Sequence, residues 1–182
     1  MSAGRNLAVD FLELRRELAA DIGRAGYVKG DFIFAGGAEG QTYFDKYGVL
    51  TRSGMLLRAA RLLAPSIPTD ADRLAATSPA TTALATAVAL ECGLDLLLPK
   101  DHGASESGYR FGGEIFPDVR VCLFEDVFFT GSRALAAARA LEQNGAAVIR
   151  IVALLDREQG AIHALEHGGF PATTLFTEGD LR

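Results

Sequence analysis

The sequence has few of the residues that mark metal centres, disulfide scaffolds and nucleic-acid surfaces. Its two cysteines, Cys92 and Cys122, form neither a CxxC pair nor a zinc-binding pattern. Both lie among apolar residues, so we expect two buried thiols and a cytoplasmic protein. Lysine occurs only as Lys29, Lys46 and Lys100, no block of basic residues is present, and the net charge is −5. This charge balance argues against a nucleic-acid partner, which usually requires a basic field.

Long hydrophobic runs and the common nucleotide motifs are also missing. No apolar run approaches the roughly 20 residues needed to cross a bilayer, so we expect no membrane partner. Residues 1–23 mix charged with apolar residues, which is not the pattern of a signal peptide. The chain contains no GxxxxGK[ST], no GxGxxG and no HExxH. His163 and His167 are four residues apart on an expected helix, and we interpret them as surface residues rather than half of a metal site.

The length and the apolar patterning predict one α/β domain. The 182 residues, 49% hydrophobic and 23% charged, suit a single domain over residues 1–182. The spacing of apolar residues predicts a helix over 7–24, a hairpin over 27–48 and a helix over 53–64. Expected strands (74–76, 94–98, 119–124, 147–155, 172–176) then alternate with expected helices (81–92, 132–143, 159–167), with an irregular segment over 99–113. This alternation predicts parallel strands joined by right-handed crossovers.

The segment VRVCLFEDVFFTGSRALAAARAL, residues 119–141, combines an apolar run, two acids, a short turn and a helix. We expect the strand to stop at Glu125 and Asp126, at the sheet edge where ligands bind in such folds. Thr130-Gly131-Ser132 then begins a helix whose free N–H groups favour an anion, and Ser132 can cap that helix. A phosphate beside two carboxylates fits a phosphorylated sugar, although paired acids also occur simply to solvate a strand end.

VCLFEDVFFTGS resembles the 5-phosphoribosyl 1-pyrophosphate (PRPP) motif of type I phosphoribosyltransferases, and the chain is most similar to the orotate phosphoribosyltransferases. GDFIFAGGAEGQTYFD, LATAVALECGLDLLL, KDHG and LLDREQG resemble further segments of that family in the same order, so that the resemblance covers residues 30–181. It implies a central parallel sheet with helices on both faces and a small N-terminal hood of one helix and one hairpin. It also implies transfer of a phosphoribosyl group from PRPP to a nucleobase, orotate or a related pyrimidine, giving a nucleoside 5′-monophosphate and pyrophosphate.

The resemblance assigns roles to individual residues. Lys100, His102 and Asp126 are implied as catalytic, with Lys100 stabilising pyrophosphate from a mobile loop. Phe44 and Arg157 are implied near the base. The implied PRPP-binding residues, besides Lys100, are Glu125, Asp126, Val127, Phe128, Phe129, Thr130, Gly131 and Ser132. Mg²⁺ is the implied cofactor, held mainly by substrate oxygens, and a loop that reaches the neighbouring subunit's site implies a homodimer. Without the resemblance, Lys100 would be a solvated loop residue and Arg157 a partner of Asp156 or Glu158.

Several positions depart from the family pattern. Leu96 and Leu97 stand where the family usually carries an Arg-Lys pair, and residues 77–83 lack the usual glycines and charge. Phe128 and Phe129 replace small or hydroxyl residues, and either pack under the turn or narrow the pocket. Losing one preorganised charge-stabilising group costs on the order of 3–4 kcal/mol of transition-state stabilisation. Two alternatives therefore stay open: a catalytically impaired protein that binds a nucleotide or phosphosugar in a regulatory or partner-subunit role, and a phosphoribosyl hydrolase.

Overall fold

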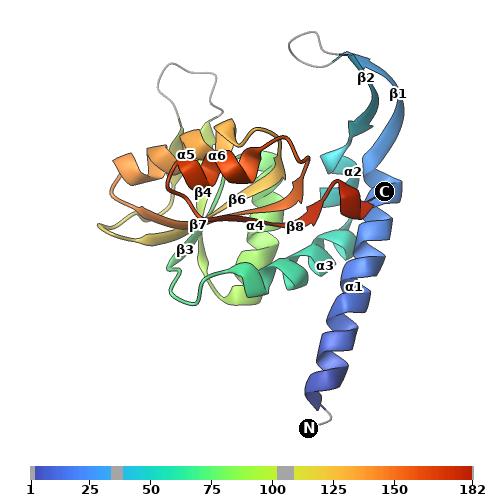
Figure 1. Cartoon of the computed structure of the whole chain (residues 1–182). Helices are drawn as coiled ribbons and strands as arrows, with labels where there is room; N and C mark the ends of the chain where they lie inside the picture. Colours follow the sequence, from blue (N-terminus) through green and yellow to red (C-terminus); the bar gives the residue numbers. More distant parts are fainter. Residues whose placement is uncertain (1–2, 34–38, 102–108, 182) are drawn as a thin grey trace.

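A six-stranded sheet forms the centre of the protein, in a computed structural model that describes residues 3–33, 39–101 and 109–181 (Figure 1). Its strand order is β5-β4-β3-β6-β7-β8, and all neighbouring strands are parallel except the antiparallel pair β4–β5. The strands are β3 (Arg73–Ala76), β4 (Asp95–Asp101), β5 (Arg110–Gly112), β6 (Arg120–Phe128), β7 (Ala147–Asp156) and β8 (Ala172–Thr177). The predicted α/β fold with a central parallel sheet is confirmed.

Helices cover both faces of this sheet (Figure 1). Alternating residues of β6 divide between two cores: Cys122 and Phe124 pack on the side of α3 and α4, whereas Val121 and Leu123 pack on the side of α5 and α6. This two-residue alternation is expected for a strand that is buried on both faces. The helices are α1 (Ala3–Gly26), α2 (Lys46–Leu50), α3 (Ser53–Leu63), α4 (Pro79–Cys92), α5 (Ser132–Gln143) and α6 (Ala161–His167), with short 3₁₀ turns at Ala64–Ser66 and Gly179–Leu181. The expected helix over 132–143 matches α5, and Gly93 ends α4 in the left-handed conformation, with φ 69°.

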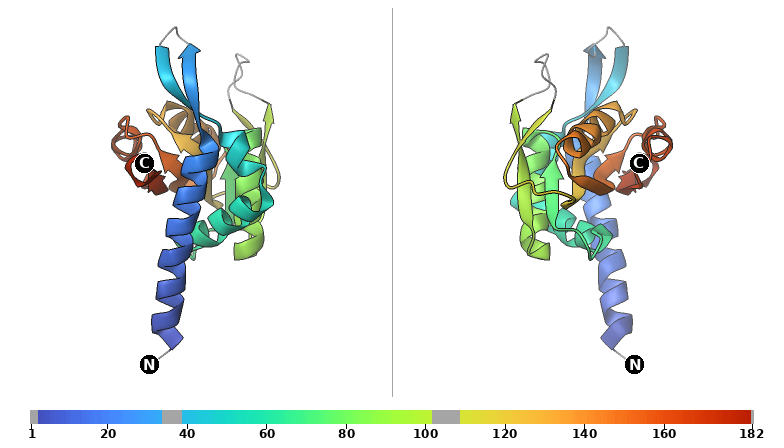
Figure 2. Two further views of the ribbon diagram at one scale, coloured as in Figure 1. Left: turned by 90° about the vertical axis from the view of Figure 1, so that its right-hand side faces the viewer. Right: turned by 90° about the vertical axis from the view of Figure 1, so that its left-hand side faces the viewer.

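The N-terminal helix and hairpin lie on the side of the sheet where the strand β8 ends (Figures 1 and 2). The hairpin pairs β1 (Tyr27–Ile33) with β2 (Glu39–Phe44) in antiparallel register. At its base, Asp45 accepts a hydrogen bond of 3.0 Å from the backbone N–H of Tyr47 and so caps α2, a helix that the sequence did not predict. The packing of α1 against α2 and α3 joins the hairpin to the sheet.

The described parts of the segment expected to be irregular, residues 99–101 and 109–113, include strand structure. β4 continues through Pro99 to Asp101, and β5 pairs back against it. The ladder between β3 and β4 ends at Leu97, so Pro99 lies where the strand has a neighbour on one side only, a position that tolerates a missing N–H. None of the described helices has the length and apolar character needed to span a membrane.

Candidate active site

The two carboxylates lie inside β6 rather than beyond its end. β6 remains hydrogen-bonded to β7 past both acids, with Glu125 opposite Ala153 and Phe128 opposite Asp156. The exposed fractions of Glu125 and Asp126 are 2% and 1%. The prediction that this strand stops at Phe124 was therefore wrong. Charged groups can be buried in a strand only where partners compensate them, and both acids have such partners.

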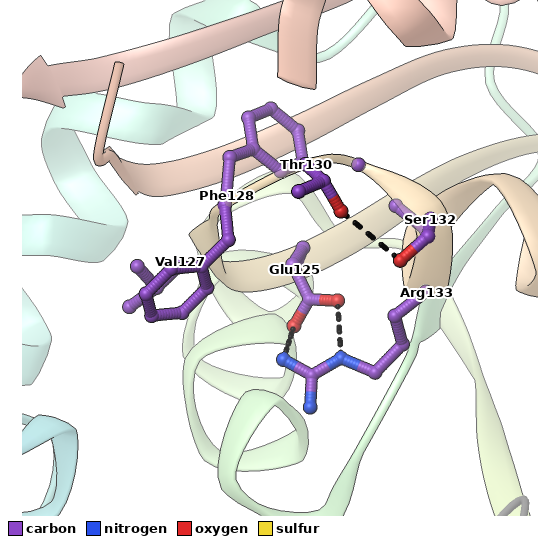
Figure 3. Close-up of a pocket in the computed structure, with 9 residues that line it drawn as sticks. Glu125, Val127, Phe128, Thr130, Ser132 and Arg133 are labelled. Atoms are coloured by element: carbon purple, nitrogen blue, oxygen red, sulfur yellow. Dashed lines mark hydrogen bonds and ion pairs between the residues drawn. The ribbon is translucent and has the colours of Figure 1, made fainter. Parts of the chain in front are cut away.

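A cation from a different helix pairs with each acid, and Figure 3 shows the pair formed by Arg133 and Glu125. Arg133, in the first turn of α5, donates from Nε to Oε2 and from Nη2 to Oε1 of Glu125, each over 3.0 Å. Lys46 of α2 donates from Nζ to Oδ2 of Asp126 over 2.7 Å. The backbone N–H of Val127 donates to Oδ1 of the same aspartate over 2.7 Å. Two carboxylates and two cations thus form a formally neutral cluster, in which the paired bonds of Arg133 are of the strong, charge-assisted kind.

The environment of Glu125 favours its protonated form. Burial is the largest cause that raises the pKa of this carboxyl group to about 7, and the neighbouring charge of Asp126 adds to it. The guanidinium of Arg133 acts in the opposite direction and lowers the pKa. On the α4 side, the hydroxyl of Thr81 lies 3.5 Å from Oε1 of Glu125. Glu125 therefore titrates close to neutral pH, where its ability to accept hydrogen bonds changes.

The turn before α5 depends on a glycine. Gly131 occupies the N-cap position with φ 78°, and a Cβ there would lie 3.0 Å from the carbonyl oxygen of Ala161. Because Gly131 is the N-cap, the expected capping role of Ser132 was wrong. Ser132 begins the helix with an exposed side chain and accepts a 3.1 Å hydrogen bond from the Thr130 hydroxyl. The turn borders a pocket of about 270 Å³, lined by Glu125, Val127, Phe128, Phe129, Thr130, Gly131, Ser132, Arg133 and Ala134 (Figure 3).

The two phenylalanines of the turn have different roles. Phe128 is 1% exposed and packs in the core under α5 and α6. Phe129 is 44% exposed, and the centre of its ring lies 5.6 Å from the guanidinium carbon of Arg157. Both residues border the pocket, but they differ in burial: the Phe128 side chain packs as core, whereas the Phe129 ring is accessible.

Arg157 lies at the end of β7 between two aromatic rings. Its guanidinium carbon is 5.9 Å from the ring centre of Tyr27, and its Nε donates to Oε2 of Glu178 over 2.7 Å. The partner is thus Glu178 rather than Asp156 or Glu158. Phe44, expected near the base, is 6% exposed and packs edge-on against Tyr27 at 5.4 Å. Phe44 is therefore a core residue, and Tyr27 is the aromatic residue of this region that contacts Arg157.

Lys100 lies on β4 with an exposed side chain. Its stem runs beside Gly112 of β5, where a Cβ would lie 2.9 Å from the Lys100 Cε atom. His102 lies outside the described residues. Leu97 is fully buried and Leu96 packs against the core under α4, so these two positions supply apolar packing where the family usually carries cations.

The comparisons with known proteins decide the family. The chain is 33% identical over 176 residues to the orotate phosphoribosyltransferase of Pyrococcus abyssi, covering 92% of this chain and 95% of that protein. It belongs to the orotate phosphoribosyltransferase family. No family model matches the chain.

Solved structures agree with this assignment. Orotate phosphoribosyltransferase of Mycobacterium tuberculosis in complex with inorganic phosphate superposes with a TM-score of 0.80 at 25% identity, covering 93% of this chain and 98% of that one. A structure of the same enzyme in complex with PRPP superposes with a TM-score of 0.76 at 24% identity, covering 92% and 98%. The shared fold therefore extends over nearly the whole chain.

Sequence reasoning missed both cations that pair with the buried acids, Lys46 and Arg133. The scarcity of lysine made each of the three lysines, Lys46 among them, worth examining. Lys46 was expected in a strand, however, and lies in α2. Arg133 follows the turn directly and could have been found by asking which cation neutralises a buried acid eight residues earlier. Both pairings are properties of the folded chain rather than of a local motif.

The described residues contain no group of three or more His, Cys, Asp and Glu side chains arranged to hold a metal ion. The rings of His163 and His167 are 6.5 Å apart on α6. Of the two cysteines, Cys122 is fully buried and Cys92 is half-buried, so the expectation of buried thiols holds fully for Cys122 only.

Proposed function

We propose that the protein is an orotate phosphoribosyltransferase, a glycosyltransferase of pyrimidine biosynthesis that transfers the phosphoribosyl group of PRPP to orotate. The products are a nucleoside 5′-monophosphate and pyrophosphate. The observation that carries this proposal is the family membership of a chain in which a buried acid pair lies directly before the turn of α5.

The geometry supports a division of labour around the sugar. Glu125 and Asp126 accept hydrogen bonds from the ribose hydroxyls, and the backbone N–H groups of the Thr130-Gly131-Ser132 turn hold the 5′-phosphate at the positive end of α5. The turn faces a pocket that also contains Glu125, so one ligand can reach both. The reaction passes through a transition state with positive charge on the sugar ring, and the held sugar needs only a small displacement toward the base.

Arg157 supports the assignment of the base. A guanidinium recognises a carboxylate through paired hydrogen bonds, and orotate carries such a group next to its ring. Arg157 is 14% exposed, and Glu178 together with two aromatic rings restricts its orientation. A restrained guanidinium loses little entropy on binding, which favours a planar carboxylated base over an uncharged one.

Mg²⁺ fits this site as a partner of the substrate rather than of the protein. Both acids are already paired with cations, and the described residues form no three-ligand metal cluster. Mg²⁺ prefers to keep water and phosphate oxygens as ligands, and PRPP supplies such oxygens. When bound, the ion would offset charge on the departing pyrophosphate, and the protein would contribute Lys100 from β4.

Two measurements test the proposal. Calorimetry with PRPP and Mg²⁺ is expected to show binding below about 1 mM, and a pyrophosphate-release assay is expected to show turnover with orotate but not with uracil, adenine or hypoxanthine. Binding without turnover on any base would favour the impaired, ligand-binding alternative. That alternative draws on Leu96 and Leu97, which are packed in the sheet where the family usually carries cations.

Lys100→Ala tests the catalytic assignment within this function. Removing one preorganised cation from a charged leaving group is expected to lower turnover by about 10²–10³-fold, with a smaller effect on PRPP affinity. Arg52→Ala, an exposed change at the start of α3, serves as the control. Wild-type turnover in the Lys100 variant would remove this residue from the mechanism.

We also propose that residues 1–182 form one phosphoribosyltransferase domain and that the protein works as a cytoplasmic homodimer. Sedimentation equilibrium over a range of protein concentrations tests the dimer, and a monomer that retains full turnover would contradict it.

A further inference from the structure

The acid pair of β6 is buried, so its charge state depends on neighbouring side chains. Glu125 and Asp126 are almost fully removed from solvent, and a buried carboxylate without a partner costs several kcal/mol. A carboxyl group accepts hydrogen bonds from ribose hydroxyls most strongly when it is ionised and held in one orientation. The structure provides one residue that meets both requirements for Glu125.

That residue is Arg133, which the family resemblance did not assign. Its fork contacts both oxygens of Glu125 at 3.0 Å, and Nη2 reaches Oδ1 of Asp126 at 3.5 Å. The residue is in the first turn of α5, so the turn that would hold the phosphate also positions this guanidinium. The side chain is 42% exposed along the pocket, and Figure 3 shows its fork closed on Glu125.

We propose that Arg133 is a positioning residue of the ribose subsite: it favours the ionised form of Glu125 and fixes the orientation of the carboxylate that accepts the ribose hydroxyls. This inference rests on the proposed function. Oε1 of Glu125 already accepts hydrogen bonds from Arg133 and, over 3.1 Å, from the backbone N–H of Asp126, whereas Oε2 accepts one bond, from Arg133, within the described part of the chain. A carboxylate oxygen has two lone pairs, so Oε2 can accept a second bond from a ribose hydroxyl. Lys46 stands in a similar relation to Asp126, with a single bond of 2.7 Å.

The charges around Glu125 agree with this role. The side chains that face it are Asp126 on the same strand, Arg133 on α5, the hydroxyl of Thr81 on α4 and the phenol of Tyr109, while Lys46 of α2 faces the aspartate. Burial and Asp126 raise the pKa of Glu125, and Arg133 lowers it. Loss of Arg133 therefore shifts Glu125 toward its protonated form at neutral pH.

PRPP calorimetry on Arg133→Gln and Arg133→Lys, between about pH 6 and 9 and with Mg²⁺ present, tests the proposal. The affinity of Arg133→Gln is expected to be about tenfold or more below the wild type near pH 7, and the gap is expected to narrow as pH rises and Glu125 ionises in both proteins. Arg133→Lys keeps a cation without the fork, so it is expected to restore part of the affinity.

Arg139→Gln is the matched control, because Arg139 is exposed on the same helix and makes no ion pair within the described part of the chain. Thermal unfolding of each variant checks that it folds. Tighter PRPP binding by Arg133→Gln would overturn the proposal, since Arg133 would then be an obstruction that PRPP must displace. A loss of affinity that is the same at every pH would also overturn it, because a purely structural role predicts that result.

A second readout does not depend on PRPP. An NMR titration of the Glu125 carboxyl carbon in the unliganded protein is expected to give a higher pKa in Arg133→Gln than in the wild type. An unchanged pKa would refute the role of Arg133. A wild-type protein that fails to bind PRPP would instead refute the proposed function, and the titration would still decide whether Arg133 controls Glu125.

Discussion

Replacing Glu125 with glutamine is expected to make the protein more stable at mildly alkaline pH. The same substitution is expected to weaken substrate binding. In the folded protein, burial first and Asp126 second raise the pKa of Glu125 from 4.5 to about 7. The folded state therefore holds a proton that the unfolded state has released between these two values, so stability falls as pH rises through this range. At 1.36 kcal/mol for each pH unit, the difference corresponds to about 3 kcal/mol.

Glutamine has nearly the shape of the protonated acid but does not titrate. Denaturant unfolding of the wild type and Glu125→Gln at about pH 5 and pH 8 measures the difference in the free energy of unfolding between the two proteins. We expect similar stabilities near pH 5 and an advantage of about 3 kcal/mol for the variant near pH 8. Glu142→Gln, an exposed change on α5, serves as the control for loss of a charge. If the free energy of unfolding changed with pH in the same way in the wild type and in Glu125→Gln, the reasoning would be refuted.

Three further substitutions test other parts of the site. Lys46→Met leaves Asp126 without its closest cation and is expected to lower the free energy of unfolding by about 2–3 kcal/mol, measured by urea unfolding, with Lys46→Arg much milder. Gly131→Ala places a side chain at φ 78° against a carbonyl oxygen at 3.0 Å, so a loss of about 2 kcal/mol and a Tm lower by about 4–8 °C are expected in calorimetry. Phe129→Leu removes the ring beside Arg157 and is expected to raise KM for orotate about two- to fivefold, with KM for PRPP little changed and Phe129→Tyr close to wild type. Equal changes in both KM values would show that Phe129 acts on the turn as a whole.

The parts of the fold that were predictable from the sequence are those with local causes. The start of α5 follows from a glycine turn, and the end of α4 follows from Gly93 in the left-handed conformation. The continuous apolar run along β6 predicted a strand that is covered on both faces, and its residues divide between two cores. Its length was not predictable in the same way, because backbone pairing with β7 continues past Phe124, where the apolar run ends.

The missed residues have non-local causes. Lys46 and Asp126 are 80 positions apart and meet only because α2 folds back toward the end of β6. Tyr27, rather than Phe44, contacts Arg157, since the two aromatic residues face each other across the base of the hairpin and only one of them faces the arginine. Periodicity shows that both belong to the hairpin but not which ring meets β7.

The arrangement of charge also bears on whether the departures from the family pattern disable the site. Leu96 and Leu97 stand where the family usually carries two cations. The folded protein brings two other cations, Lys46 and Arg133, to the carboxyl edge of the sheet. These cations do not replace the missing ones, because each is already paired with a buried carboxylate and the cluster is formally neutral. Under the proposed function, Lys100 and Mg²⁺ bound by the substrate would offset charge on the departing pyrophosphate. Turnover in this protein is therefore expected to depend more strongly on that single lysine than it would in a site with spare cations.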